Sequence, residues 1–209
     1  MPVTVLLTMG MALLCNRVRK LSFLYETLFA LPMAVSMSAV ALIYKIMLNP
    51  SVGIVNAVTG SECAWYQGRD TALLSIILLT VWMGLGFNFL FFLASVRSVP
   101  ECQIEAARLD GAGPVGIFFH IQLPHMLPTV GYVVCTNTVQ ALMTSGPIII
   151  LTQGGPSRAT TTLIYMMYTQ GYGSSNYSLA ACVSLFTFAL AFVFTLLGFI
   201  ADRRRRAAE

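Results

Sequence analysis

The most polar and glycine-punctuated stretch of this otherwise apolar chain, and the first place to look for chemistry, is EAARLDGAGPVGIFFHIQLP, which runs from Glu105 to Pro124. It holds two carboxylates, an arginine and a histidine. Nothing in the sequence resembles a nucleophile elbow or a Walker A loop. His120 and His125 lie five residues apart without a cysteine ligand pair, which argues against a metal site. We therefore expect no catalytic residue, no metal and no cofactor bound by this chain, and we interpret the stretch as a surface for another protein.

The stretch has the composition of a small protruding knob. Residues 105–109 are good helix formers, and Gly111, Gly113 and Pro114 then end that helix sharply. A second short helix is expected from Pro114 through Ile121, since proline is tolerated in a first turn. Ala106 and Ala107 would permit close approach of a partner's backbone, while Glu105 and Asp110 would supply charged contacts at the rim.

The remainder of the sequence predicts the elements that hold this knob. Of 209 residues, 57% are hydrophobic and 10% are charged, against about a quarter charged in soluble domains. A bilayer core about 30 Å thick needs about 20 apolar residues per helix. Four runs reach that length and one is shorter, and all are continuously apolar rather than alternating. We predict an all-α, polytopic transmembrane bundle of about five spans in a single domain, 1–209, with runs at 2–15, 21–48, 71–96, 126–151 and 178–200.

The basic residues predict the orientation of these spans. Strict alternation places nine of the twelve on one side, and the positive-inside rule makes that side cytoplasmic. The loop 98–125 and a basic tail, 202–209, would then face the cytoplasm of a bacterial inner membrane. The short first run precedes its positive charges, unlike a signal peptide, and we expect a truncated start or a missing first helix. The nine are Arg17, Arg19, Lys20, Arg97, Arg108, Arg203, Arg204, Arg205 and Arg206; the others are Lys45, Arg69 and Arg158.

The longer outer segment, 152–177, begins TQGGPSRATTTLIYMMYTQGYG. Regular secondary structure is expected to be interrupted at Gly154, Gly155 and Pro156. The apolar residues that follow recur at three- and four-residue spacing, which favours an amphipathic helix at the outer interface. The break could cap the bundle or contact a partner. The five cysteines lack CxxC spacing and are interpreted as free thiols.

Two groups of polar residues within the spans are candidates for a solute pathway. Asn137, Gln140 and Thr144 are spaced to share one face of a helix, and Asn88 lies in another span. Hydrogen bonding between helices is the alternative for both groups. Lys45 near a helix end is interpreted as snorkelling to the interface, with attraction of a phosphate as the alternative. The four consecutive arginines from Arg203 suit an orientation anchor that contacts anionic lipid.

The knob matches a known family pattern at seven positions with two fixed gaps: Glu105, Ala106, Ala107, Gly111, Ile121, Leu123 and Pro124. It is similar to the EAA loop of the permease subunits of binding-protein-dependent ABC importers. The resemblance extends through NPSVG (49–53), NFLFFLA (88–94) and GGPSRATTTLIY (154–165). Together these segments resemble the carbohydrate branch, most of all the sn-glycerol 3-phosphate and sugar permeases.

The resemblance implies a non-enzymatic subunit that forms half of a pathway for a sugar, polyol or glycerol 3-phosphate. ATP would be bound and hydrolysed by separate ATPase subunits docked on the loop. A second permease subunit, in a heterodimer, and an extracytoplasmic solute-binding protein are the other implied partners, with membrane lipid and without nucleic acid. The alternatives are a truncated or structural subunit and, less favoured by the uncharged spans, an ion-coupled transporter.

Overall fold

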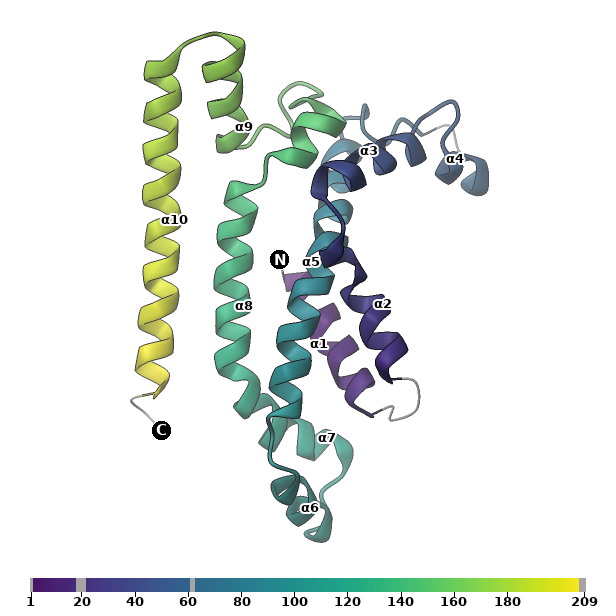
Figure 1. Cartoon of the computed structure of the whole chain (residues 1–209), viewed down its shortest axis with the longest axis vertical. Helices are drawn as coiled ribbons and strands as arrows, with labels where there is room; N and C mark the ends of the chain where they lie inside the picture. Colours follow the sequence, from purple (N-terminus) through teal and green to yellow (C-terminus); the bar gives the residue numbers. More distant parts are fainter. Residues whose placement is uncertain (1, 18–21, 61–62, 207–209) are drawn as a thin grey trace. The chain divides into compact units, whose positions relative to one another are not determined.

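A computed structural model of the chain describes residues 2–17, 22–60 and 63–206, and these residues form helices without any strand (Figure 1). The all-α prediction is confirmed. Three of the helical segments are π-helices, named η here. In chain order the elements are α1 Pro2–Arg17, α2 Ser22–Ala34, α3 Met37–Met47, α4 Ile54–Thr59, α5 Thr71–Arg97, α6 Glu101–Leu109, α7 Pro114–Ile117, η1 Phe118–Gln122, α8 Leu123–Met143, η2 Ile148–Thr152, α9 Leu163–Tyr168, η3 Thr169–Gly173 and α10 Tyr177–Arg206.

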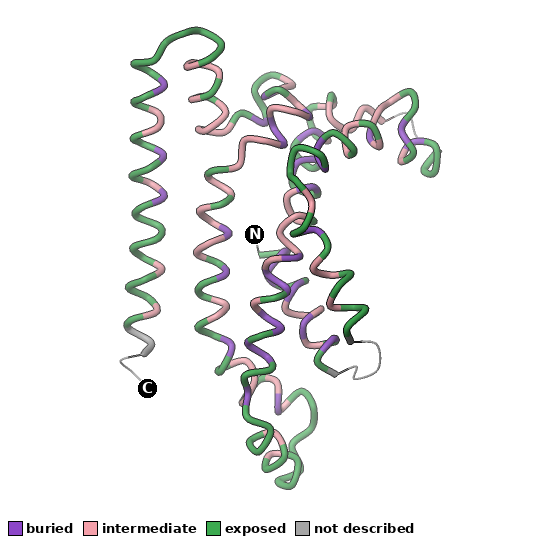
Figure 2. Tube along the Cα trace, viewed as in Figure 1, coloured by how far each residue is buried: buried purple, intermediate pink, exposed green. Residues whose placement is uncertain are grey.

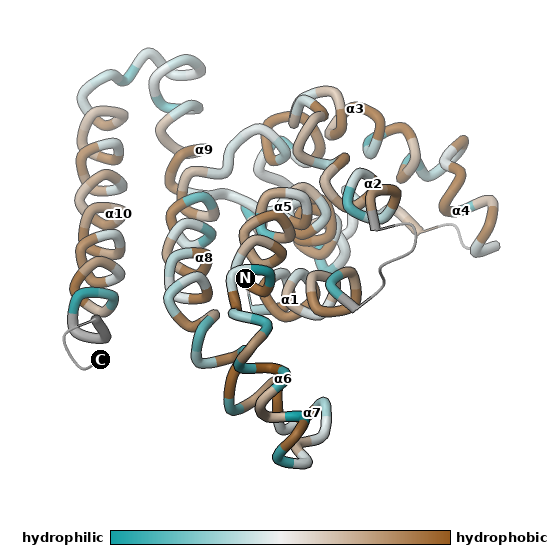
Figure 3. The backbone as a smooth tube through the Cα atoms, turned by 60° about the horizontal axis from the view of Figure 1, so that its bottom comes forward, coloured by the Kyte–Doolittle hydropathy of each residue, from teal (hydrophilic) through white to brown (hydrophobic). Residues whose placement is uncertain are grey.

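Three helical segments are long and apolar enough to cross a membrane, at Thr71–Arg97, Pro114–Thr152 and Tyr177–Arg203, within the described part of the chain. A fourth span is possible if α2 and α3 cross together, and α1 is a shorter apolar helix. Large apolar side chains stay exposed along these helices, and Figure 3 shows hydrophobic residues along most of α5 and α10. Because water would not tolerate so much apolar surface, lipid or other membrane subunits must cover it.

The apolar run 21–48 differs from its prediction, because it is not one uninterrupted helix. Val35 and Ser36 separate α2 from α3 without helical structure, three residues after Pro32. Proline lacks the N–H that an interior helical position needs and crowds the preceding turn, so it weakens the helix there. Of the basic residues that precede this run, Arg19 and Lys20 lie outside the described residues.

The chain divides into two compact units. The first contains residues 1–33, 84–137 and 197–209, and the second contains residues 34–83 and 138–196. The long helices α5, α8 and α10 each contribute to both units.

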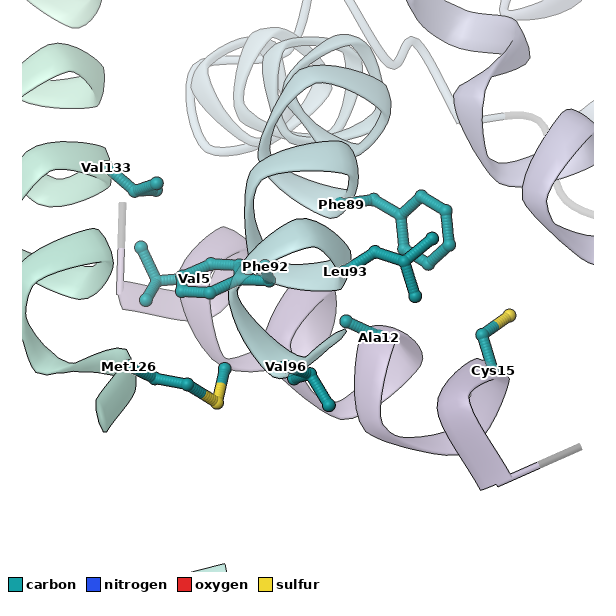
Figure 4. Packing of buried hydrophobic residues seen from close by; sticks show 9 residues of the cluster. All are labelled: Val5, Ala12, Cys15, Phe89, Phe92, Leu93, Val96, Met126 and Val133. Atoms are coloured by element: carbon teal, nitrogen blue, oxygen red, sulfur yellow. The ribbon is translucent and has the colours of Figure 1, made fainter. Parts of the chain in front are cut away.

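The core of the first unit forms where α1 and α8 pack on the second half of α5 (Figure 4). Phe89, Phe92 and Val96 of α5 are almost fully buried. Phe29 of α2 packs edge-to-face on Phe89, with ring centroids 5.3 Å apart. Gly86 lets α2 approach closely, since a Cβ there would lie 2.9 Å from the backbone nitrogen of Met33. The end of α5 that leads into the knob is thus fixed by packing on three sides.

The second unit has a polar cap at the start of α5. The Asn56 side chain of α4 donates to the carbonyls of Pro50 and Cys63 and accepts a 2.6 Å bond from the Trp65 indole. Ser75 donates to the Trp65 carbonyl. These bonds satisfy the backbone carbonyls of Pro50, Cys63 and Trp65, which lie outside the helices. Hydrogen bonds therefore tie the described residues on both sides of α4 to α4 and to the start of α5.

Candidate functional site

The knob predicted from the sequence consists of α6, a tight turn and the helical residues that follow. α6 begins at Glu101, four residues earlier than predicted, so Glu101 rather than Glu105 occupies the first turn, where a carboxylate suits the helix dipole. After Leu109, the amides of Asp110, Gly111 and Ala112 bond back to carbonyls of the last turn. Gly111 has φ +81°, a conformation that costs a residue with a Cβ about 1–2 kcal/mol. The turn is therefore closed by backbone bonds and depends on glycine.

The second half of the knob is not the separate short helix that we predicted. α7, η1 and α8 follow one another without a break from Pro114 to Met143. The π-turn at Phe118–Gln122 ends two residues before Pro124, and the Leu123 amide bonds to the Phe118 carbonyl five residues back. A proline ring crowds the carbonyl four residues earlier and offers no N–H, and a π-turn is one way for a helix to absorb that defect. The helix α8 is therefore an extension of the knob.

The outer surface of the knob carries apolar side chains that nothing covers. Leu109 is 89% exposed and Val115 is 69% exposed, and Phe119 further along is also exposed. Figure 2 shows exposed residues through most of α6, the turn and the start of α7. Ala106, Asp110, Gly111 and Pro124 are exposed as well, while Ala107, Ile121 and Leu123 are partly buried. Leu109 and Val115 were not among the residues predicted for the site, although an isolated leucine and an isolated valine in a polar loop were the available signal.

A hollow of about 890 Å³ lies behind the knob, between α6, the start of α7 and the ends of α1 and α5. Glu101, Glu105 and Arg108 of α6 face it together with Arg97, and Ile104 and Ile117 form its apolar part. Glu101, Glu105 and Arg108 are solvent-exposed, as Leu109 is, so the surface of α6 carries charged and apolar side chains side by side.

Three side-chain contacts fasten the base of the knob. Arg97 at the end of α5 makes a two-pronged ion pair with Glu26 of α2, at 2.5 and 3.3 Å. His125 and Thr129 of α8 bond to Ser98 and Ser95 at 3.2 and 3.0 Å. The histidine is thus a structural contact, and no cluster of metal-ligating side chains occurs in the described ranges. Movement of the knob would be passed to α5 and α8 together.

Two of the pathway candidates, Asn88 and Asn137, bond to each other. The Asn88 side-chain amide donates to Asn137 Oδ1 at 3.3 Å. The Asn137 side-chain amide donates to Asn88 Oδ1 at 3.1 Å and to the Val133 backbone carbonyl at 2.8 Å. The residues are 1% and 5% exposed. In this arrangement each amide satisfies the other, which favours the packing alternative.

The other two pathway candidates lie further along the chain. Gln140 is exposed on α8. Thr144 follows the end of α8 at Met143, so the predicted helical face does not extend to it. Its hydroxyl bonds to the Gln140 carbonyl at 2.8 Å. A pathway role for Gln140 and Thr144 stays a prediction.

The helix predicted in the outer segment is present. It is α9, Leu163–Tyr168, which continues without a break as the π-helix η3 through Gly173. Before it, Gly154, Gly155 and Pro156 lie in a loop whose hydroxyl groups bond its own backbone, as Thr160 does to the Gly155 carbonyl at 2.8 Å. α10 continues beyond the predicted run 178–200 as far as Arg206, so the described residues of the basic tail are helical, and residues 207–209 lie outside the described residues.

Comparison with known proteins places the whole of this architecture in one class. Residues 5–207 match the family described as the binding-protein-dependent transport system inner membrane component, so the chain belongs to this family of ABC importer permeases. The sn-glycerol-3-phosphate transport system permease protein UgpA of Pectobacterium atrosepticum is 35% identical over 198 residues, which are 93% of this chain and 67% of the relative. UgpA of Yersinia pestis is 34% identical with the same coverage.

Solved structures share the fold. A bacterial ABC transporter that imports the acidic polysaccharide alginate contains a chain with a TM-score of 0.85 and 24% identity, covering 97% of this chain and 72% of that one. The MetNI methionine ABC transporter, in an inward-facing conformation, gives a TM-score of 0.70 at 16% identity, with 96% and 87% covered. The resemblance that the sequence motif indicated is confirmed, and the chain is a multi-pass inner membrane permease.

Proposed function

We propose that the chain forms half of the translocation pathway of an importer for a sugar, polyol or glycerol 3-phosphate. We also propose that the loop 98–125, which contains the knob, docks into a separate ATPase subunit. The observation that carries the docking is the exposed apolar pair Leu109 and Val115 at the tip of a turn that is closed by backbone bonds. Apolar side chains held rigidly in the open are typical anchors for a partner's groove.

The remaining partners follow from the family and the relatives. A second permease subunit would complete the pathway, and the exposed apolar faces of the long helices supply the surface for it and for lipid. A solute-binding protein would dock at the outer loop, where Gly154, Gly155 and Pro156 lie. The relatives named for sn-glycerol 3-phosphate favour a phosphorylated polyol as solute.

We propose a cytoplasmic position for the knob and the carboxyl terminus, on the distribution of basic residues. ATP would be hydrolysed by the partner alone, so that this chain holds no cofactor and performs no catalysis. Closure of two ATPase subunits would move the two knobs of the permease pair, and α5 and α8 would carry that movement into the membrane. Binding of the partners would shift the population of the permease between inward- and outward-facing arrangements.

The test is affinity purification of the chain from native membranes, with the co-purifying proteins identified by mass spectrometry. Gly111→Pro should lose the ATPase while it retains the second permease, because proline cannot adopt φ +81°. Gly113→Ala is the matched control: Gly113 has φ −72° and nothing lies within 4 Å of an added Cβ. An intact chain that recovers no ATPase would refute the proposal, as would equal recovery with Gly111→Pro.

A further inference from the structure

A second hollow lies within the second unit, in the outer segment between Gln153 and Gln170. Its volume is about 310 Å³ and its lining comes from this segment alone. That volume is at the small end of ligand pockets, which run from about 300 to 1,000 Å³. It therefore has the size for a small molecule.

The lining of this hollow is mixed, with apolar surface from residues such as Tyr165 and Met166 beside polar groups, and it carries one positive charge, the exposed Arg158. Arg158, Gln153 and Gln170 contribute a guanidinium and two amides, and Thr161 and Thr169 contribute hydroxyls. Tyr165 provides a ring. The lining residues include no carboxylate, and Arg158 makes no ion pair with any residue that the structure describes. A guanidinium offers donors in a planar fork that suits carboxylate and phosphate groups, so this one is available to an anion from outside the chain.

The backbone that carries these side chains is held in unusual conformations. Gln153 and Arg158 have φ +50° and +63°, which residues with a Cβ rarely adopt, and Gly154 between them has φ +77°. A Cβ on Gly154 would overlap the Tyr165 ring. The loop is kept in this form by bonds from Thr160 to the Gly155 carbonyl and from Thr161 to the Gly154 carbonyl, at 2.8 and 3.3 Å. Strained backbone that its surroundings fix in this way is characteristic of ligand-binding loops.

We propose that this hollow is a solute-contact site that selects small anionic polyols, with Arg158 paired to a phosphate or carboxylate group. The Tyr165 ring would lie against the carbon chain, and the Gln153 and Gln170 amides would bond its hydroxyls. This proposal rests on the proposed importer function and adds a determinant of solute specificity to it. Arg158 would be the residue that distinguishes an anionic solute from a neutral one. The site differs from a contact with the solute-binding protein, which would use Arg158 for a protein carboxylate.

The experiment is equilibrium binding of radiolabelled sn-glycerol 3-phosphate to the purified complex of the permease and ATPase subunits, without the solute-binding protein. The complex is held in nanodiscs of zwitterionic phosphatidylcholine, so that neither the binding protein nor anionic headgroups compete. Arg158→Gln should weaken binding by about tenfold or more, the effect of one lost charge-assisted bond. Arg158→Lys should retain part of the affinity that Arg158→Gln loses. Arg69→Gln, at another exposed arginine of the second unit, is the matched control and should bind normally. Unlabelled glycerol should compete poorly and inorganic phosphate should compete well.

Three results would overturn the proposal: no saturable binding by the unmodified complex, equal binding by Arg158→Gln, or equal competition by glycerol and glycerol 3-phosphate. A loss of binding-protein docking in Arg158→Gln, with solute binding unchanged, would assign the arginine to the protein contact instead. The same purification reports separately on the proposed function. A complex that lacks an ATPase subunit contradicts the importer assignment, whereas a complete complex whose binding ignores Arg158 contradicts only this inference.

Discussion

Replacement of Leu109 by alanine isolates the contribution of the knob's tip to docking. Because the side chain is 89% exposed, its truncation should change the unfolding free energy of the chain by less than about 0.5 kcal/mol. Full burial of a leucine in a partner's groove is worth about 1.5–3 kcal/mol relative to exposure, and alanine retains part of this. We expect a loss of about 1–2 kcal/mol in docking, which corresponds to about 5- to 30-fold in affinity.

The assay is binding of the purified ATPase subunit to the chain in nanodiscs, with thermal unfolding of the same preparations measured in parallel. Val58→Ala is the matched control, since Val58 is another apolar side chain that is 81% exposed but lies on α4 of the second unit. Val58→Ala should leave the affinity unchanged.

Two results would refute the reasoning. If Leu109→Ala bound as tightly as the unmodified chain, the tip would not be the anchor. If it lost stability as well as affinity, Leu109 would be a packing residue and its exposure would not reflect the folded chain.

Three further predictions concern packing in the first unit. Asn137→Ala should lower the unfolding free energy by about 1–2 kcal/mol, and adding Asn88→Ala should cost little more, because the first change already breaks the pair; unchanged stability with altered uptake would favour the pathway role instead. Gly86→Leu should destabilise the chain by about 1–3 kcal/mol through contact with the backbone of α2, whereas Gly10→Leu, with open space around Gly10, should not. Arg97→Gln should cost less than about 1 kcal/mol, since Arg97 is 45% exposed and its pair with Glu26 is screened by water; a larger loss in a denaturant titration would show that the pair holds α2 in place.

The long helices could be predicted from the sequence because lipid imposes a simple requirement on length and hydropathy. The run that became α5 was identified to within one residue at each end, whereas α10 extends six residues beyond the predicted end of its run, into the arginines. The interruption of the helix at Val35 and Ser36 was not predicted. The segments on both sides of it are apolar, and hydropathy alone does not reveal a break in the helical backbone. Pro32 was the available signal for this break, but the average hydropathy of the run 21–48 did not reveal it.

The site was predictable where local chemistry determines it. The turn at Gly111 followed from glycine and proline placement, and its positive φ is in keeping with that reasoning. The join of α7 to α8 was missed because Pro124 suggests a helix start, while a π-turn lets the helix continue through it. The reciprocal hydrogen bonds between Asn88 and Asn137 could not be predicted from the sequence either. It depends on which faces of α5 and α8 meet, and tertiary packing decides that.

The most direct test of the account is photo-crosslinking from the tip of the knob in intact membranes. A photoreactive phenylalanine analogue at position 109 should yield an adduct with an ATP-binding subunit, and the same group at position 58 should not. The adduct at position 109 would place the ATPase on the knob without relying on any loss of function. An adduct only with lipid or with another membrane protein at position 109 would contradict the proposal that this segment couples the permease to its ATPase.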